Sequence, residues 1–493
     1  MNQTKKEIIK EMENNEKQGH TFIIQAELID RCSKKTKSTP KEILLSELAE
    51  MVRGKELAQE GERIYLPQTK EYEDMAAAAL AEIFSKSPLP PVEVPEKLMV
   101  GDMLLADEQR KAVSFALNHR VSLILGGAGS GKSALIQAIV QNFPKNKGSF
   151  VLCSPTGKAA NNLRERTNIW NAVTVHAVFW RAFEEKQKIF DKLVIVDEIS
   201  MVSLEMLTWI LTSIQPDCRL VLVGDSSQLP SVRCGNVVND LLKLKVPSIR
   251  LKNCYRQSDK KSSLAWNLAN FDRCRRTVDF SFDGSFCFIS LRGDYSIRKK
   301  VCSLAEECYR KGENAQLLTP LVEKSVLSAY ELNDVLQNAL IPNEELRQYP
   351  LREGDRVQIT SNDWAQNVMN GQVGTLHFLQ TGKKEPQYKI TCGKQYAVYD
   401  AGTVKSFASL AYAITVHKSQ GSEYDTVIIP ISRRFLPFVK RNLLYTAISR
   451  AKKKVILVGD PDVLDEILKA FPDKRNSALV EKTRALLYRG TAA

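Results

Sequence analysis

Short apolar runs alternate with amphipathic stretches along most of the chain, beginning at about residue 100. The apolar runs cover residues 121–127, 150–155, 192–198, 219–225, 315–321, 425–430 and 454–460. Buried parallel strands give continuous apolar runs, and strands that alternate with helices are typical of a doubly wound α/β sheet. The last run of the first half of the chain and the last run of the second half have nearly the same sequence, LVLVGD at 220–225 and VILVGD at 455–460. The pattern therefore predicts two similar α/β domains rather than one large domain.

The first hundred residues follow a different pattern. Residues 22–33 and 40–53 carry the apolar spacing of helices, and a short hairpin is predicted to turn at Gly61. This order favours a small winged-helix module, although a plain helical adaptor without nucleic-acid contacts fits it equally. A further helix over 72–85 leads into a boundary at 87–97, where four prolines interrupt both helix and central strand.

Residues 351–400 alternate apolar and polar positions and are punctuated by glycines. Alternation with a period of two is typical of half-buried antiparallel strands. The stretch lies between apolar runs of the second half. It therefore predicts a small antiparallel β barrel inserted into the second α/β domain.

Composition and charge narrow the class of protein. The chain has 493 residues, of which 43% are hydrophobic and 26% charged, as in a globular protein of several domains. No apolar run reaches the ~18–20 residues that span a bilayer, and the charged N-terminus lacks an export signal, so we expect a cytoplasmic protein without membrane contacts. The net charge of +13 favours a polyanionic partner. The ten cysteines form no CxxC unit, which indicates reduced thiols rather than zinc ligands or disulfides.

The octapeptide GGAGSGKS (Gly126 to Ser133) matches the phosphate-binding motif GxxxxGK[ST] and lies between a predicted strand and a predicted helix. Backbone N–H groups curl around phosphates in such a loop, and the helix N-terminus adds partial positive charge. Lys132 is predicted to reach the β- and γ-phosphates of ATP, and Ser133 to coordinate Mg²⁺. The residues predicted to cradle the nucleotide are Gly127, Ala128, Gly129, Ser130, Gly131, Lys132 and Ser133.

The apolar run at 192–198 ends in two acids, Asp197 and Glu198. A phosphate-binding loop needs an acidic group at the end of a neighbouring strand. Asp197 is therefore predicted to hold the Mg²⁺ shell, and Glu198 to activate the attacking water. The two motifs together predict hydrolysis of ATP without indicating its purpose.

Further motifs follow one another in a fixed order. They are ADEQRKAV (106–113), SPTGKAANNL (154–163), TVHAVF (174–179), GDSSQLPSVRCGN (224–236), YRQ (255–257), AITVHKSQGSEYDTVII (413–429) and LLYTAISRAKKKVILVGD (443–460). This series resembles the RecD-like helicases of superfamily 1B over residues 104–460. The resemblance implies an α/β fold of two RecA-like motor domains that close on one ATP.

For the nucleotide site, the resemblance implies roles for residues of both domains. Gln109 would read the adenine, because an amide both donates and accepts, and Gln228 would sense the γ-phosphate. Arg256 and Arg450 would supply cations for the charge that develops on the transferred phosphoryl group. The residues of the second domain that would face the nucleotide are Gln420, Gly421 and Glu423.

The same resemblance implies a track for single-stranded DNA made of small or cationic donors at loop ends. The implied contacts are Pro155, Thr156, Lys158, His176, Thr319, Pro320, Thr415, His417, Lys418 and Ser419. Movement would run 5′ to 3′, on single strands and on tailed or forked duplexes, by a motor expected to be monomeric.

The resemblance also divides the chain. The predicted parts are an N-terminal module and linker (1–96), a first motor domain (97–245), a second motor domain (246–350 with 406–493) and an inserted SH3-like barrel (351–405). The family's strand-splitting pin lies between the TVH motif and the strand that ends in the acids. Only residues 180–192 separate these elements here, which leaves room for a minimal hairpin at most.

Two alternatives remain open at this point. A translocase or nucleoprotein remodeller without robust unwinding fits the short connection. RNA also fits a track of backbone contacts, because such contacts distinguish the sugars poorly. A purely structural DNA-binding module is disfavoured by the intact catalytic pair.

Overall fold

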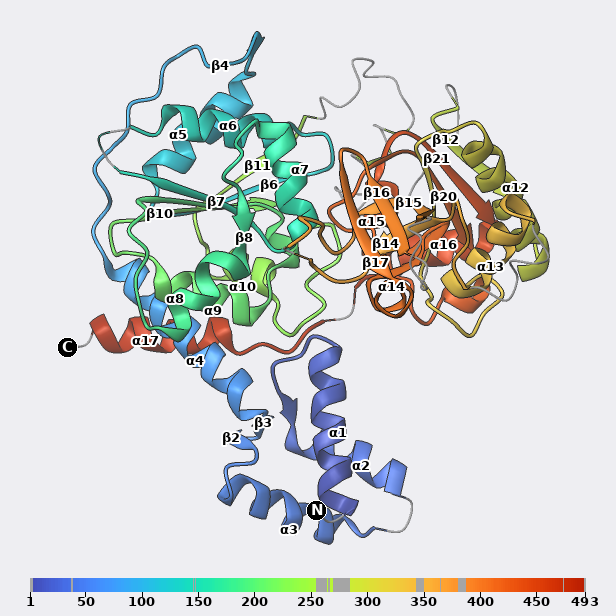
Figure 1. The fold of residues 1–493 in the computed structure, drawn as a ribbon. Coiled ribbons are helices and arrows are strands. Elements are labelled where there is room, and N and C mark those ends of the chain that lie inside the picture. The colour runs from blue at the N-terminus through green and yellow to red at the C-terminus, as the bar shows by residue number, and fades with distance from the viewer. Residues whose placement is uncertain are drawn as a thin grey trace.

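The computed structural model describes residues 3–36, 39–144, 146, 148–253, 264, 267–268, 284–342, 350–363, 365–379, 387–472 and 474–491. Two α/β units lie side by side, and a small N-terminal module lies below them (Figure 1). Each unit is built on its own parallel sheet, as the alternating apolar runs predict. Within the described ranges, no helix is both long enough and apolar enough to cross a membrane.

The first unit contains a parallel sheet with the strand order β11-β6-β10-β9-β7-β8. Its strands are β6 (Val121–Gly126), β7 (Phe150–Ser154), β8 (Val173–Thr174), β9 (Leu193–Val196), β10 (Arg219–Gly224) and β11 (Ser248–Leu251). Strands β6, β9 and β10 are buried throughout, which explains their uninterrupted apolar sequences. The four apolar runs predicted here as strands are confirmed, whereas the edge strands β8 and β11 lacked such a run.

Helices cover both faces of this sheet. On one face lie α5 (Asp107–Asn118), α6 (Lys132–Asn142) and α7 (Gly157–Thr167), and on the other lie α9 (Leu204–Ser213) and α10 (Val237–Lys243). A short hairpin of β4 (Met99–Val100) and β5 (Met103–Leu104) precedes α5, and the 3₁₀ helix η3 (Ile199–Met201) precedes α9. Because the strands are parallel, the loops that follow β6, β7, β9 and β10 meet at one edge of the sheet.

The second unit contains a parallel sheet in the order β12-β21-β20-β13-β19. The strands are β12 (Phe286–Ser290), β13 (Ala315–Thr319), β19 (Ala413–Thr415), β20 (Tyr424–Ile431) and β21 (Ala451–Gly459). The surrounding helices are α12 (Asp294–Arg310), α13 (Ala329–Leu340), η5 (Arg433–Phe435), α15 (Arg441–Ile448) and α16 (Pro461–Lys469). The three apolar runs predicted for this half form β13, β20 and β21.

The stretch predicted as an inserted barrel forms a five-stranded antiparallel sheet in the order β17-β16-β15-β14-β18. Its elements are β14 (Arg356–Ile359), β15 (Val373–Leu379), β16 (Gln387–Cys392), β17 (Gln395–Asp400), α14 (Ala401–Phe407) and β18 (Ala408–Leu410). Strand β18 lies beyond residue 405, the predicted end of the insertion. It pairs with the second edge of β14 before the chain returns to the parallel sheet.

The N-terminal module combines helices with a small sheet of order β1-β3-β2. Its elements are α1 (Gln3–Lys17), β1 (Ile23–Ile24), α2 (Gln25–Thr36), α3 (Lys41–Arg53), β2 (Ala58–Glu60) and β3 (Arg63–Tyr65). The predicted hairpin is confirmed, and Gly61 takes a left-handed φ of +60° at its turn. The helix predicted from residue 22 starts only at Gln25, because Ile23 is buried by pairing with β3.

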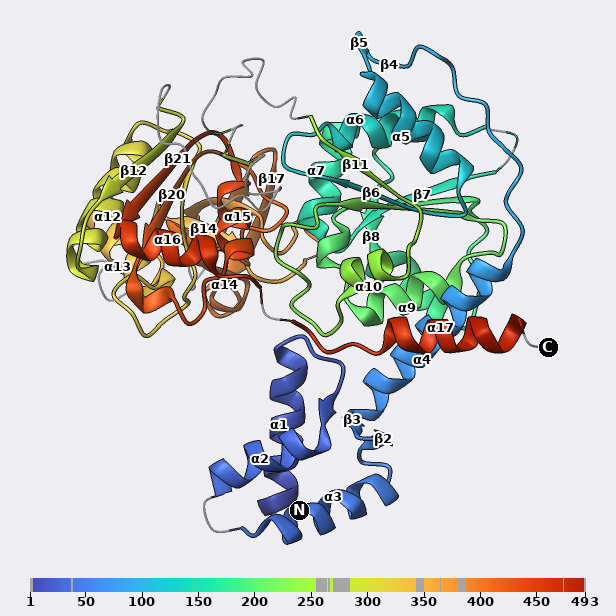
Figure 2. The same cartoon turned by 180° about the vertical axis from the view of Figure 1, so that it is seen from behind.

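The C-terminal helix of the chain packs on the first unit, beside the helix that follows the N-terminal module. Helix α4 (Pro67–Ser85) leads from the module to this unit, and α17 (Leu479–Thr491) lies beside it in both views (Figures 1 and 2). Although the sequence assigned 406–493 to the second domain, α17 packs on the first unit. The physical reason is that Leu479 joins the apolar cluster formed by α4 and α9.

Residues 180–192, all of which the structure describes, contain no paired strands. The π-helical turn η2 (His176–Trp180) continues into α8 (Arg181–Glu184), and the chain then runs directly to β9. The minimal hairpin expected here is therefore not formed. The segment lacks Gly and Pro, and its Arg, Ala and Glu residues favour helix.

Candidate functional site

The phosphate-binding loop joins β6 to α6 in a tight turn. Gly131 takes a left-handed φ of +79°, which a side chain would strain. A Cβ atom at Gly126 would lie 2.4 Å from Ser130 Oγ and 3.2 Å from Leu251 Cβ, so a side chain there would displace these neighbours. Lys132 Nζ donates to the carbonyl oxygens of Gly126 (2.7 Å) and Gly127 (2.9 Å), and this holds the ammonium group inside the loop.

Asp197 and Glu198 follow β9 at the same edge of the sheet. Burial, together with the neighbouring Glu198 carboxylate, raises the pKa of Asp197 above its usual range, while the Lys132 ammonium opposes this shift. Glu198 has a left-handed φ of +57°. Such strained backbone in a residue other than glycine persists only where the surroundings hold it, and it clusters at active sites.

Two polar atoms of this region are buried without a hydrogen-bond partner among the described residues, Asp197 Oδ1 and Ser130 Oγ. Buried polar atoms are normally satisfied, so both atoms are suited to meet polar groups of a ligand. A carboxylate and hydroxyls beside an ammonium group and a glycine-rich loop suit a polyphosphate that carries a hard cation. The residues present therefore fit ATP with Mg²⁺.

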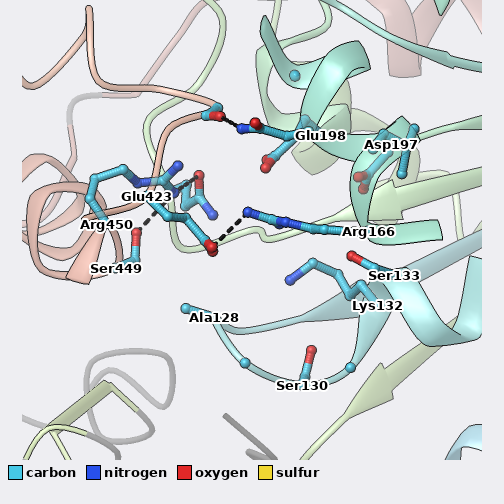
Figure 3. A pocket seen from close by; sticks show the side chains of 17 residues that line it. Ala128, Ser130, Lys132, Ser133, Arg166, Asp197, Glu198, Glu423, Ser449 and Arg450 are labelled. Atoms are coloured by element: carbon cyan, nitrogen blue, oxygen red, sulfur yellow. Dashed lines mark hydrogen bonds and ion pairs between the residues drawn. The ribbon is translucent and has the colours of Figure 1, made fainter. Parts of the chain in front are cut away.

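These groups line a pocket of about 290 Å³ between the two units (Figure 3). The first unit contributes Ala128, Gly129, Ser130, Gly131, Lys132, Ser133, Ala159, Asn162, Leu163, Arg166, Asp197, Glu198 and Gln228. The second unit contributes Gly421, Glu423, Ser449 and Arg450. The structure thus brings most of the sequence-predicted nucleotide residues together, although they come from opposite halves of the chain.

The loop after β10 joins the two units through polar contacts. Arg450 Nη2 donates to Gln228 Oε1 (2.9 Å), and both side chains are buried. The Tyr445 hydroxyl donates to Asp225 Oδ2 (2.6 Å). Every one of these groups lies on a motif that the sequence singled out. The predicted γ-phosphate sensor Gln228 is therefore in direct contact with Arg450, one of the two arginines predicted to supply a cation.

Arg166 is a pocket residue that the sequence motifs missed. Its Nη2 lies 2.7 Å from Glu423 Oε2 of the second unit, and the pair crosses the pocket (Figure 3). Nearby on α7, Asn162 Nδ2 donates to the carbonyl oxygen of Gly421. Ala159, Asn162 and Arg166 are spaced along one face of α7, as helical periodicity requires. Helical periodicity in the sequence could therefore place these three residues on one face of α7, but it could not indicate which residues that face contacts.

Two predicted nucleotide residues of the described part of the chain are placed differently, and Gly127, whose carbonyl oxygen accepts from Lys132 Nζ, does not line the pocket. Gln109 is buried in α5, and its Oε1 accepts from the backbone N–H of Ala106 (3.2 Å); it is absent from the pocket lining in the described part of the chain. Gln420 lines a second groove instead of the pocket. Arg256 lies outside the described residues.

A groove separate from the nucleotide pocket runs between the two units and the inserted sheet, with a volume of about 610 Å³. Its lining includes Pro155, Thr156, Lys158 and His176 of the first unit, Asn362, Asn370 and Gly371 of the inserted sheet, and His417, Lys418 and Gln420 of the second unit. Six of these are predicted DNA contacts, so the structure gathers them on one surface. Small polar groups and cations are the donors that bind a nucleic-acid backbone.

Lys158 connects the first unit to the inserted sheet. Its Nζ donates to the carbonyl oxygen of Gly371 (2.6 Å). Burial, together with the nearby Arg356 guanidinium, lowers the pKa of Lys158 to about 8. The side chain is therefore a cation whose charge is sensitive to mildly alkaline pH.

Four predicted DNA residues are not part of the groove lining. Thr319 Oγ1 donates to the carbonyl oxygen of Leu327 (2.6 Å), and Ser419 Oγ donates to that of Val416 (2.7 Å). Thr415 Oγ1 accepts from the backbone N–H of Lys418 (3.2 Å). These three hydroxyl residues are buried and shape the loops that carry the groove. Pro320 is half-buried beside Thr319.

Two family models match the chain. A model described as an AAA domain matches residues 104–283, and a model described as a UvrD-like helicase C-terminal domain matches residues 410–458. The first match contains the phosphate-binding loop and both acids. The second contains the loop around Gly421 and the pocket arginine Arg450.

Curated relatives match over most of the chain. The ATP-dependent RecD2 DNA helicase of Deinococcus radiodurans is 30% identical over 459 residues, which cover 87% of this chain and 60% of the relative. The RecBCD enzyme subunit RecD of Mycobacterium tuberculosis is 28% identical over 448 residues, which cover 79% of this chain and 75% of the relative. The chain thus spans less than two thirds of the length of the first of these relatives. Among solved structures, the Pif1 helicase from Candida albicans is 18% identical, with a TM-score of 0.49 over 78% of this chain and 100% of that chain.

Proposed function

The chain belongs to the RecD-like helicases of superfamily 1B, and on that premise we propose that it is an ATP-driven motor that moves 5′ to 3′ along single-stranded DNA. Tailed or forked duplexes are the proposed substrates for unwinding. The observation that carries the proposal is a short loop shared by two sites. Gly421 and Glu423 line the nucleotide pocket, whereas Lys418 and Gln420 line the groove. A displacement of this loop in the pocket would therefore be transmitted directly to the groove.

The predicted catalytic residues have distinct roles in the proposed hydrolysis. Lys132 and the N–H groups of its loop bind and orient the β- and γ-phosphates. Ser133 and Asp197 would hold Mg²⁺, which neutralises phosphate charge when it is bound. Glu198 positions the attacking water and accepts its proton. Arg450, oriented by Gln228, supplies a cation from the second unit, and Arg256 keeps its predicted role as another.

We propose that the two units hold the strand in turn, and that this alternation moves the motor along the strand. Thr156 and His176 would hold the strand on the first unit, and His417 and Lys418 on the second. Closure of the pocket on ATP would bring the two grips together, and hydrolysis would release them. Net movement then follows if the grips weaken in turn.

The accessory parts are proposed on the same family basis. Residues 1–96 would act as a winged-helix-like module, and residues 351–405 as an SH3-like barrel that covers the groove. The motor domains would span 97–245 and 246–350 with 406–493, the last helix of which packs on the first unit. We propose a cytoplasmic location on the same family basis, and a monomeric motor because both units that line the nucleotide pocket come from one chain.

The test is ATP hydrolysis measured with and without single-stranded DNA, together with unwinding of 5′-tailed, 3′-tailed and blunt duplexes. We expect stimulation by the single strand and unwinding of the 5′-tailed duplex alone. The logarithm of affinity should fall with the logarithm of salt concentration, with a slope of about −0.7 per phosphate contacted. An ATPase indifferent to DNA and salt would contradict the motor, and unwinding only from a 3′ tail would contradict the direction.

A second candidate is a translocase that remodels nucleoprotein without robust unwinding. The absence of paired strands in residues 180–192 favours it, because no rigid hairpin is present there to split a fork. Displacement of a protein block from single-stranded DNA, without separation of a forked duplex, would select this candidate. An RNA strand of the same sequence, measured in parallel, tests whether the sugar is distinguished.

A further inference from the structure

A small aromatic surface extends the groove at its edge on the first unit. Helix η2 begins with His176 and Ala177, which line the groove, and ends one turn later at Trp180. The imidazole ring of His176 and the indole ring of Trp180 are stacked, with centroids 5.2 Å apart and an interplanar angle of 16°. Trp180 is nevertheless 44% exposed. A flat aromatic face is therefore open to solvent beside the groove.

Buried residues of the first unit hold the two stacked rings in place. Trp209, which is 4% exposed, meets the His176 ring edge-on at 5.5 Å and 85°. Phe179 is buried in the core of the first unit and anchors the helical turn. Single π-helical turns are rare and occur frequently at functional sites. A ring held in place in this way loses little conformational entropy when a flat ligand covers it.

Among the described residues that line the groove, the aromatic groups able to support a base are the imidazole rings of His176 and His417. Lys158, Lys418 and Thr156 are suited to phosphate oxygens, and the described residues that line the groove include no Phe, Tyr or Trp. Contacts to phosphate fix the backbone of a strand but leave its bases unsupported. Stacking on an aromatic side chain supports any base, because every base has a π face.

We propose that Trp180, backed by His176, stacks on one nucleobase of the strand that occupies the groove. The ligand is thus a nucleobase of single-stranded nucleic acid, recognised by its flat face and not by its sequence. This inference rests on the proposed function, since it requires a strand in the groove. The inference gives a role in strand binding to Trp180, which does not itself line the groove.

The test compares a strand that has bases with one that lacks them. Binding of a labelled oligothymidylate of about 16 nucleotides and of an abasic strand of the same length is measured by fluorescence anisotropy. Wild type should bind oligothymidylate more tightly than the abasic strand. Trp180→Ala should lose about 5- to 150-fold in affinity for oligothymidylate and bind the abasic strand as wild type does. Trp180→Phe should recover most of the loss, because a ring remains.

Trp170 provides a matched control. It is 69% exposed, its Nε1 donates to Asn168 Oδ1 (3.0 Å), and it does not line the groove. Trp170→Ala should therefore bind both strands as wild type does. Equal quenching of intrinsic fluorescence by oligothymidylate in wild type and Trp180→Phe would count against the platform, since the Trp180 indole should be the quenched reporter.

The outcomes separate the two proposals. If wild type binds oligothymidylate and Trp180→Ala binds it equally well, the stacking platform is overturned while the motor stands. If Trp180→Ala loses the same affinity for both strands, Trp180 acts only by shaping η2, and the platform is again overturned. If wild type binds neither strand, the proposed function fails and the platform fails with it.

Discussion

Lys132 and Glu198 have separable roles in the proposed hydrolysis. Lys132→Ala should abolish turnover, because positioning and charge at the phosphates supply most of the catalysis in such sites. Glu198→Gln keeps the shape of the side chain but cannot accept a proton, so it should bind Mg-ATP and lose roughly 10²- to 10⁴-fold in turnover. Steady-state hydrolysis and binding of a fluorescent ATP analogue measure the two effects. Near-normal turnover in Lys132→Ala, or lost binding in Glu198→Gln, would contradict these roles.

The ion pair between Arg166 and Glu423 should contribute to closure of the pocket. Because the Arg166 side chain is 40% exposed, its coupling to Glu423 is expected to be modest, about 0.2–1 kcal/mol. Arg166→Ala should raise the KM for ATP by up to about fivefold, with a smaller change in kcat. A double-mutant cycle with Glu423→Ala isolates the coupling.

Arg310 is a suitable control for this cycle, because it forms an exposed ion pair with Glu306 on α12, outside the pocket. Arg310→Ala should leave the KM for ATP unchanged. Additive effects of Arg166→Ala and Glu423→Ala would show that the pair does not act across the pocket.

Lys158 should make strand binding depend on pH. Since burial lowers its pKa to about 8, the side chain is charged at neutral pH and becomes neutral as the pH rises through that value. Affinity for single-stranded DNA should therefore fall between about pH 7 and 9 by the loss of one phosphate contact. Anisotropy titrations at fixed ionic strength measure this fall. Lys158→Met should bind more weakly at pH 7 and lose the pH dependence, whereas Lys418→Met should retain it.

At the scale of secondary-structure elements, α17 is held on α4 by a partly buried network of charged side chains. Lys482 Nζ lies 2.5 Å from Asp74, 3.0 Å from Glu60 and 3.3 Å from Glu73. Glu73 is fully buried and also accepts from the Ala478 backbone N–H (2.9 Å). The network therefore joins the C-terminal helix, the N-terminal module and the first unit.

Lys482→Met should destabilise this junction, because it leaves the Glu73 carboxylate buried without its cation. Breaking a buried pair costs about 3–5 kcal/mol, and the half-exposed Asp74 and Glu60 reduce the effect here. Thermal unfolding and limited proteolysis near α17 measure the loss. The additional change Glu73→Gln should restore part of it. Lys469→Met, which removes an exposed pair with Asp465, should change stability by no more than about 1 kcal/mol.

At the scale of the whole molecule, the loop from Lys418 to Glu423 links the pocket to the groove. Binding of nucleotide and binding of the strand should therefore be thermodynamically coupled, typically by about 1–3 kcal/mol. By reciprocity, a non-hydrolysable ATP analogue should change strand affinity by the same factor as the strand changes affinity for the analogue.

Gln420→Ala should reduce this coupling, since Gln420 is the groove residue adjacent to Gly421 of the pocket. The measurement is strand affinity with and without the analogue, for wild type and variant. A coupling factor that stays unchanged in Gln420→Ala would show that the two sites communicate by another route. Asn370→Ala, which alters the groove on the inserted sheet, should weaken strand binding while preserving the coupling.

The sequence by itself determined the parallel strands β6, β7, β9, β10, β13, β20 and β21, the phosphate-binding loop and the acids that follow β9. Each of these features is local, because consecutive residues supply both the element and its chemistry. Lys132 and Asp197 could be predicted because a buried parallel strand has a recognisable sequence and the groups that follow such strands meet at one edge. The order of motifs likewise indicated Gln228 and Arg450, which the structure brings into contact.

Only the tertiary structure decided which side chains meet across the two units. Asn162 and Gly421 are in contact although they are 259 positions apart, and periodicity within α7 could not indicate its partner. Burial also separated residues that sequence treats alike: Thr156 lines the groove, whereas the hydroxyl of Thr319 is taken by a carbonyl group. Helix α17 packs on the first unit because α4 and α9 leave an apolar face there. Such contacts depend on the shapes of packed surfaces, which local sequence patterns do not contain.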